Sequence, residues 1–168
     1  PHIVFYFSDT GGGHRSAAEA IIEAINIEYK NKVTTEMVDF FKEYAPIPFN
    51  KMPELYPQLV KAPQLWGAGF HLTDGRPQAR ALTATAWPVA ARTARRIISN
   101  HPSDLVVTVH PLATSWILKA LPKNRPPFIT VVTDMVTTHA LWFDKRSDAI
   151  LVPTEIARQK ALQYGMLP

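Results

Sequence analysis

A glycine-rich loop between an apolar run and an amphipathic segment is the feature that most limits how this chain can fold. Residues 2–8 (HIVFYFS) form a continuous apolar and aromatic run, typical of a strand buried on both faces of a parallel sheet. The run leads into residues 9–13 (DTGGG), and from His14 to about Tyr29 apolar residues recur at helical spacing. The sequence therefore predicts strand, glycine loop and helix, which is one unit of an α/β fold.

The same alternation continues along the chain. Short apolar runs predict strands at residues 32–41, 105–109, 128–133 and 149–152, and helices are expected at about 78–100, at 112–121 and from Pro153 onward. Pro88 should kink the first of these helices or divide it, and the closely spaced prolines of residues 40–75 predict an irregular segment without a long helix. We expect a single domain over residues 1–168, with a Rossmann-like, doubly wound parallel sheet and helices on both faces.

Polar residues follow the predicted strands where such folds bind ligands. In open α/β sheets the ligand lies beyond the carboxyl ends of the strands. Residues 9–14, Asp39, His110 and Asp134 all come directly after a predicted strand. We therefore expect a functional site at this edge of the sheet.

The glycine loop itself predicts an anion site. Glycines let the backbone approach a ligand, and the free N–H groups of the following helix attract a phosphate. Gly11, Gly13 and Ser16 approximate the G-x-G-x-x-G/A pattern, with serine at the last position, which leaves open a dinucleotide-dependent oxidoreductase that uses Asp39 for the ribose. A merely tight turn is the simpler alternative. No Gly-Lys-Ser/Thr follows, so a P-loop is excluded.

His14 is the candidate general base. An imidazole has a pKa near neutrality, and the positive end of a helix should keep His14 uncharged and able to accept a proton. A purely structural role in the loop is the alternative. Trp142 likewise is either a core residue or part of the site.

The composition limits which kinds of binding partner we expect for the protein. The chain of 168 residues is 46% hydrophobic and 19% charged, as in ordinary globular proteins. Eighteen Lys and Arg against fourteen Asp and Glu give a formal charge of +4, which favours an anionic partner such as an acidic lipid or a nucleic acid. The sequence has no cysteine, no apolar run near the roughly 20 residues of a membrane span, and no Asp-x-Asp pair for a nucleotide-bound metal. We expect no metal, no membrane span and no export.

Five segments together resemble one known family. They are residues 8–21 (SDTGGGHRSAAEAI), Pro48-Phe49-Asn50 with Pro53, Val109-His110-Pro111-Leu112, Thr133-Asp134 with His139 and Trp142-Phe143, and Val152-Pro153-Thr154-Glu155. In this order they resemble the monogalactosyldiacylglycerol synthases and related bacterial diacylglycerol glycosyltransferases over essentially the whole chain. The sequence departs from the plant pattern at Ala140, where a proline is expected, and in the stretch 67–76.

The resemblance implies the N-terminal half of an inverting, metal-independent GT-B glycosyltransferase, peripherally bound at the cytoplasmic face of a membrane. This half would bind the lipid acceptor, and a C-terminal nucleotide-sugar domain would lie outside the chain, so the chain alone should be inactive. The implied reaction transfers a hexosyl group, galactose by preference, from a UDP-sugar to diacylglycerol, without cofactor or nucleic acid.

The resemblance also assigns roles to residues. His14 would deprotonate the acceptor hydroxyl, and Gly12 and Gly13 would face the diphosphate. Pro48, Asp134 and Trp142 would bind the acceptor or an anionic lipid. Besides the oxidoreductase, a non-catalytic membrane-binding module remains an alternative.

Overall fold

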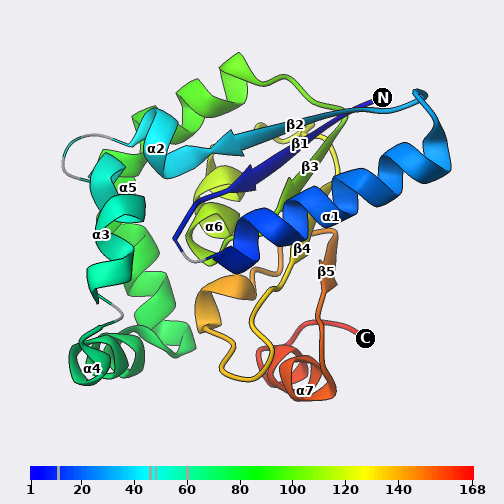
Figure 1. The fold of residues 1–168 in the computed structure, drawn as a ribbon. Helices are drawn as coiled ribbons and strands as arrows, with labels where there is room; N and C mark the ends of the chain where they lie inside the picture. The colour runs from blue at the N-terminus through cyan, green and yellow to red at the C-terminus, as the bar shows by residue number, and fades with distance from the viewer. Residues whose placement is uncertain (11, 46, 48, 60) are drawn as a thin grey trace.

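In the computed structural model of the chain, five strands form one parallel sheet in the order β2-β1-β3-β4-β5. The structure describes residues 1–10, 12–45, 47, 49–59 and 61–168. Figure 1 shows the strands in this arrangement, and their bounds are β1 (His2–Phe7), β2 (Thr34–Asp39), β3 (Leu105–Thr108), β4 (Phe128–Val131) and β5 (Ala149–Leu151). The predicted strands are confirmed, each to within two residues at either end.

Helices connect the strands. Their bounds are α1 (Gly12–Tyr29), α2 (Phe40–Tyr44), α3 (Met52–Leu59), α4 (Pro63–Thr73), α5 (Arg76–Asn100), α6 (Pro111–Ala120) and α7 (Glu155–Gln163), with single 3₁₀ turns η1 (Phe49–Lys51) and η2 (Ala140–Trp142). Among the described residues, no helix is long and apolar enough to cross a membrane.

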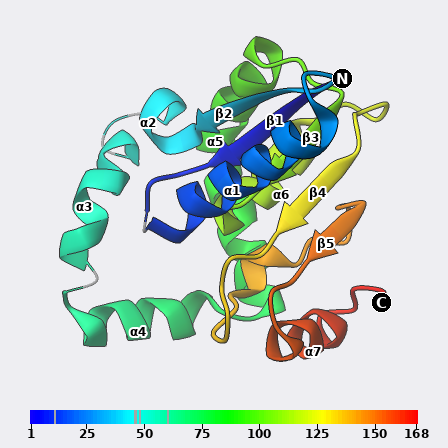
Figure 2. The ribbon, with the colours of Figure 1, turned by 45° about the vertical axis from the view of Figure 1, so that its right-hand side comes forward.

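The sheet is covered on both faces. Alternate residues of β1 separate the two cores: Phe5 and Phe7 pack with Ala18 of α1, and Tyr6 packs with Ile97 of α5 and Ile117 of α6. Figure 2 shows α1 on one side of the sheet and α5 and α6 on the other. The predicted α/β, Rossmann-like doubly wound fold is confirmed.

The proline-rich stretch differs from the expectation. It was predicted to be irregular, yet its described residues form α2, η1, α3 and α4, none longer than 11 residues. Pro53 and Pro63 lie in the first turns of α3 and α4, where a proline removes no helical hydrogen bond. Of the two alternatives predicted for Pro88, division of the helix was wrong, since α5 runs continuously through that residue, and a kink there stays a prediction.

The strand order determines where a ligand can bind. From β1 the chain passes through α1 to β2 on one side, and β3 lies on the other side of β1. The connections therefore diverge between the carboxyl ends of β1 and β3, which is the switch point where doubly wound sheets bind ligands. His14 lies in the first turn of the helix after β1, and His110 lies two residues after the end of β3.

Candidate active site

His14 lies in the first turn of α1, above the carboxyl edge of the sheet. Its Nδ1 is 3.0 Å from Oγ1 of Thr133, which follows β4. The ring also has a hydrogen bond to the backbone oxygen of Val109, next to the end of β3. The imidazole is therefore oriented by groups that follow two different strands.

The environment keeps His14 neutral. Burial lowers the pKa of its imidazole below the ordinary value of 6.5, and the nearby Asp134 carboxylate and the Val109 carbonyl only partly offset this effect. A neutral imidazole can accept a proton near pH 7. Burial is thus the main physical cause of the neutral state predicted for His14.

His110 lies directly beside His14. The ring centroids are 4.6 Å apart, and the side chain of His110 is buried. Its Nδ1 accepts a hydrogen bond from the backbone N of Leu112 at the start of α6, so Nε2 carries the proton and donates to Oγ1 of Thr10 at 2.7 Å. Burial and the neighbouring His14 lower its pKa well below 6.5. His110 is thus a neutral partner that fixes Thr10 at the entry to the glycine loop.

Asp134 and Trp142 are both brought to His14. The Trp142 indole Nε1 donates to Oδ2 of Asp134 at 2.7 Å, and its ring lies 6.0 Å from the His14 ring. Trp142 has no exposed surface. The side chain that the sequence left as either core or site is therefore buried within the site.

A second carboxylate, Asp74, supports this arrangement from α4 and α5. Its Oδ1 accepts from the backbone N of Ala140 at 2.8 Å, and its Oδ2 accepts from Nζ of Lys160 at 2.9 Å. The hydrogen bond from Ala140 requires an N–H, which a proline would lack. Alanine at residue 140, where the plant pattern has proline, therefore allows a hydrogen bond that proline could not make. Sequence reasoning missed Asp74 because its partners are 66 and 86 residues away.

The carboxylates of the two aspartates near the glycine loop form hydrogen bonds within the protein. Asp9 forms two hydrogen bonds with Arg15, at 2.7 and 2.6 Å. Asp39 accepts from the backbone N atoms of Asp9, Phe41 and Lys42, so it joins the loop to α2. Because these three amides use the Asp39 carboxylate, it is poorly available for a ribose.

The glycines have an open side. Gly12 begins α1, and a Cβ added to Gly13 would meet no atom within 4 Å. The side of the first turn of α1 at Gly13 is therefore open among the described residues. Pro48 and Gly11 lie outside the described residues.

A comparison of the sequence with known families identifies the family of the chain. Residues 14–168, which include His14, Asp134 and Trp142, match the sequence model of the family described as monogalactosyldiacylglycerol (MGDG) synthase. The chain belongs to the monogalactosyldiacylglycerol synthase family.

Curated relatives give the same result. The chain is similar to the probable monogalactosyldiacylglycerol synthase, chloroplastic, of Nicotiana tabacum, with 34% identity over 170 residues that cover 99% of this chain and 32% of the relative. It is 32% identical to monogalactosyldiacylglycerol synthase 2 of Arabidopsis thaliana, covering 98% of this chain and 36% of the relative, and 33% identical to the synthase of Spinacia oleracea, covering 99% and 33%. The chain spans about one third of the length of these MGDG synthases.

Proposed function

We propose that this chain is the acceptor-side domain of an inverting glycosyltransferase that transfers a hexosyl group, galactose by preference, from a UDP-sugar to diacylglycerol. His14 is the general base: it takes the proton of the acceptor hydroxyl as that oxygen bonds to the anomeric carbon, while the bond between that carbon and the UDP oxygen breaks. The observation that carries the proposal is the neutral His14 imidazole at the switch point of the sheet, which contacts Thr133 and lies near enough to the Asp134 carboxylate to be affected by its charge. Membership of the MGDG synthase family supports it.

Most of the binding site for the nucleotide sugar lies outside this chain. Gly12 and Gly13 approach the diphosphate, and the N–H groups at the start of α1 stabilise the negative charge that develops on it. The open side of the helix at Gly13, where a Cβ would meet no described atom within 4 Å, supports a close approach of a ligand to the backbone there. A C-terminal domain binds most of the nucleotide sugar, and the reaction needs no metal or other cofactor. The isolated chain therefore binds acceptor without turnover.

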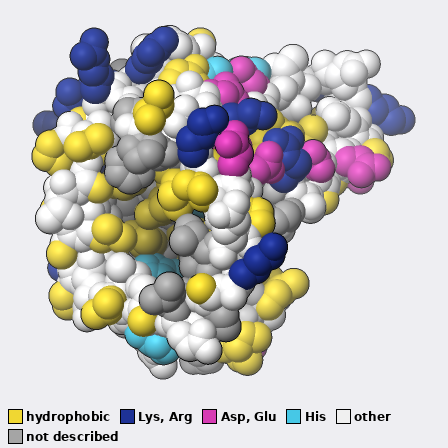
Figure 3. Space-filling model, turned by 60° about the vertical axis from the view of Figure 1, so that its left-hand side comes forward, with side chains coloured by type: hydrophobic (Ala, Val, Ile, Leu, Met, Phe, Trp, Pro, Cys, Tyr) yellow, Lys and Arg dark blue, Asp and Glu magenta, His cyan; other side chains and the backbone are white. Residues whose placement is uncertain are grey.

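An apolar region beside the histidines supports a lipid acceptor. A pocket of about 150 Å³, lined almost wholly by apolar side chains, lies between α2, α5 and α6. Its walls include Phe40 and Phe41, whose rings lie 5.1 and 6.0 Å from that of His110. Figure 3 shows a hollow surrounded by hydrophobic side chains on the side of the molecule where α2 and α3 lie.

The membrane contributes the acceptor and an anionic surface. We infer peripheral binding at the cytoplasmic face of a membrane, in which the formal charge of +4 attracts acidic lipids and nucleic acid has no part. Pro48 contributes to anionic-lipid binding. Asp134 borders the acceptor, and Trp142 acts from the interior through its hydrogen bond to Asp134.

The test is the turnover of two variants of the full-length protein. His14→Ala removes proton transfer in the transition state, so kcat should fall by about 10²–10⁴-fold. His14→Gln keeps hydrogen-bonding capacity but cannot act as the base, so its kcat should fall comparably. Both should melt near the parent temperature, and nucleotide-sugar affinity should change little. The exposed His71, replaced by Gln, is the matched control and should keep full activity.

Two results would contradict the assignment. If both His14 variants retain more than about a tenth of the parental kcat, a role as general base is excluded, given the usual size of that contribution. If the His14→Ala protein produces normal glycolipid levels in cells, the chain acts as a membrane-binding module. Identification of the products formed from diacylglycerol and a panel of nucleotide sugars would settle the sugar separately.

A further inference from the structure

A second pocket, of about 400 Å³, lies where α5, α6, the residues after η2 and the turn after α7 meet. We call it the basic pocket. Its lining includes five cationic side chains from separate parts of the chain: Arg76, Arg80, Lys119, Lys145 and Arg146. Ala140 and Leu141 of η2 also line it, whereas the neighbouring Trp142 contacts His14. The basic pocket is therefore adjacent to the candidate active site but separate from it.

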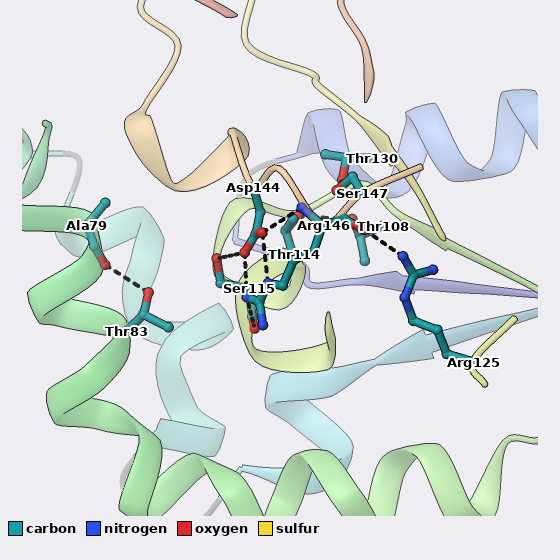
Figure 4. Close-up of polar contacts among 10 residues, drawn as sticks. All are labelled: Ala79, Thr83, Thr108, Thr114, Ser115, Arg125, Thr130, Asp144, Arg146 and Ser147. Carbon is teal, nitrogen blue, oxygen red and sulfur yellow. Dashed lines mark hydrogen bonds and ion pairs between the residues drawn. The ribbon is translucent and has the colours of Figure 1, made fainter. Parts of the chain in front are cut away.

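Acidic groups in the basic pocket do not balance these charges. Asp144 is the single carboxylate among its lining residues, and it accepts from Nε and Nη2 of Arg146 at 2.9 and 2.6 Å and from Oγ of Ser115 at 2.9 Å. Figure 4 shows Arg146 and Ser115 directed at Asp144. These contacts lower the pKa of Asp144, so it stays ionised and committed to Arg146.

The other four cations have no carboxylate partner among the residues that the structure describes. Lys119 places its Nζ 4.5 Å from the centre of the Trp87 ring, and the Arg76 guanidinium lies 5.9 Å from that of Tyr164. Aromatic faces attract a cation but do not neutralise it. The basic pocket therefore keeps an excess of positive charge.

Two of these cations approach each other beside Gly165, which we call the convergence point. A Cβ built on Gly165 would lie 2.7 Å from Nζ of Lys145 and 3.6 Å from Nη2 of Arg76. Like charges near each other repel, and an anion bound beside them in the pocket lowers this cost and is attracted to both. The proximity of these two cations, together with the excess charge, indicates an anionic ligand.

We propose that the basic pocket binds a phosphate group carried by a larger ligand. Lysine and arginine side chains are the usual partners of phosphate, and four of them remain available here. The volume falls within the range of small-molecule sites, and apolar atoms of Leu141 and Phe143 form part of the wall. The phosphate group belongs either to a water-soluble ester or to a lipid headgroup, and both present the same dianion.

Binding measurements on the full-length protein separate these sources. Inorganic phosphate, titrated calorimetrically, probes the shared chemistry. Vesicles of phosphatidylcholine, with and without phosphatidic acid, probe a membrane-borne phosphate. Saturable binding of free phosphate with no gain from phosphatidic acid supports a soluble ester. A preference for phosphatidic acid vesicles supports a headgroup in the basic pocket when substitution of the pocket cations abolishes it, because the net charge alone also attracts acidic lipids. No binding of free phosphate and no preference for phosphatidic acid would overturn the proposal.

Variants locate the site. Arg80→Gln combined with Lys119→Gln removes two cations from the basic pocket and should weaken phosphate or vesicle binding by about 25-fold, on the basis of roughly fivefold for each cation. The matched control is Lys32→Gln combined with Arg95→Gln, which changes the net charge equally at two exposed positions outside the pocket. An equal loss in both double variants would show a diffuse surface effect and contradict a defined site.

A third variant tests the convergence point. Gly165→Asp places a carboxylate between Lys145 and Arg76, and aspartate tolerates the positive φ of 72° found there better than most residues do. This internal anion should compete with the ligand, so binding should be lost while the melting temperature is kept. Unchanged binding in a folded Gly165→Asp protein would overturn the proposal. Glycosyl transfer is not needed for any of these readouts, so their outcome is independent of the proposed function.

Discussion

At the scale of single residues, the hydrogen bond between Trp142 and Asp134 connects a buried side chain to a carboxylate of the candidate active site. The indole is buried and makes its one donor available to a carboxylate that lies beside His14. A bond to an ionised acceptor contributes more to stability than one between neutral groups. Trp142 therefore both fills the interior and holds the charge that faces the candidate base.

Trp142→Phe should separate these two contributions. The phenyl ring keeps most of the packing but lacks the donor, so the free energy of unfolding should fall by about 1.5–3 kcal/mol. Urea denaturation measures the loss. Trp116→Phe is the matched control, because the Trp116 indole has no hydrogen bond among the described residues and is partly buried. Equal losses in the two variants would show that packing alone accounts for the effect.

Sequence reasoning placed His14, His110 and Asp134 at strand ends, and the structure brings all three together. Their grouping could be predicted because parallel strands end at one edge of a sheet. The contacts of Asp74 could not, since they depend on how α4, η2 and α7 pack, and no local pattern encodes that. Roles of individual residues came from the resemblance to a family rather than from spacing.

At the scale of elements, α3 and α4 differ from the rest of the molecule. No described residue of either helix is buried. Their main contacts are with each other, η1, α2 and α5, and not with the sheet. Helices this short are marginal in water without packing against a core. The described side chains of α3 and α4 therefore add no buried residue to the core.

Hydrogen exchange should detect this difference. Amides of α3 and α4 should exchange much faster than those of β4, because local opening exposes few apolar contacts. Mass spectrometry of the exchanged protein gives the comparison, and α6, which has four buried residues, is the internal control. Protection of α3 as strong as that of β4 would contradict the expectation.

Strands and helices differed in how well the sequence predicted them. Strands were predicted nearly to the residue because buried parallel strands are uninterrupted apolar runs. The helices in residues 40–75 were missed, because prolines were taken as breaks although Pro53 and Pro63 lie in first turns, where proline is accepted. Pro88 shows the converse, since packing keeps α5 helical around a residue that disfavours a helix.

At the scale of the whole molecule, three histidines make folding sensitive to acid. Burial lowers the pKa values of His14, His110 and His139 below 6.5 in the folded state. In the unfolded chain each imidazole titrates near its ordinary value. Below that value the unfolded chain binds protons that the folded protein does not, so stability falls as the pH falls.

We therefore expect the melting temperature to decrease between pH 7.5 and pH 5. Unfolding in the lower part of this window should take up protons, at most one for each of these three histidines. Calorimetry in two buffers with different ionisation enthalpies measures this uptake. Carboxyl groups with lowered pKa values, such as Asp74 and Asp144, destabilise the protein only at more acidic pH, so they do not obscure the result. A melting temperature independent of pH over this range would refute the expectation.

The contacts of Asp74 also bear on the order in which the molecule assembles. Asp74 joins the start of α5 to η2 and to α7, and its hydrogen bond to Lys160 spans 86 residues. Contacts between residues so distant in sequence form late in folding. During synthesis, which proceeds from the N-terminus, the β1 and α1 segments emerge first, but Asp74, which binds η2, acquires its full set of partners only after residue 160 has left the ribosome. A nascent chain that ended within β5 would thus carry His14 without the completed surroundings that orient Trp142 and Asp134.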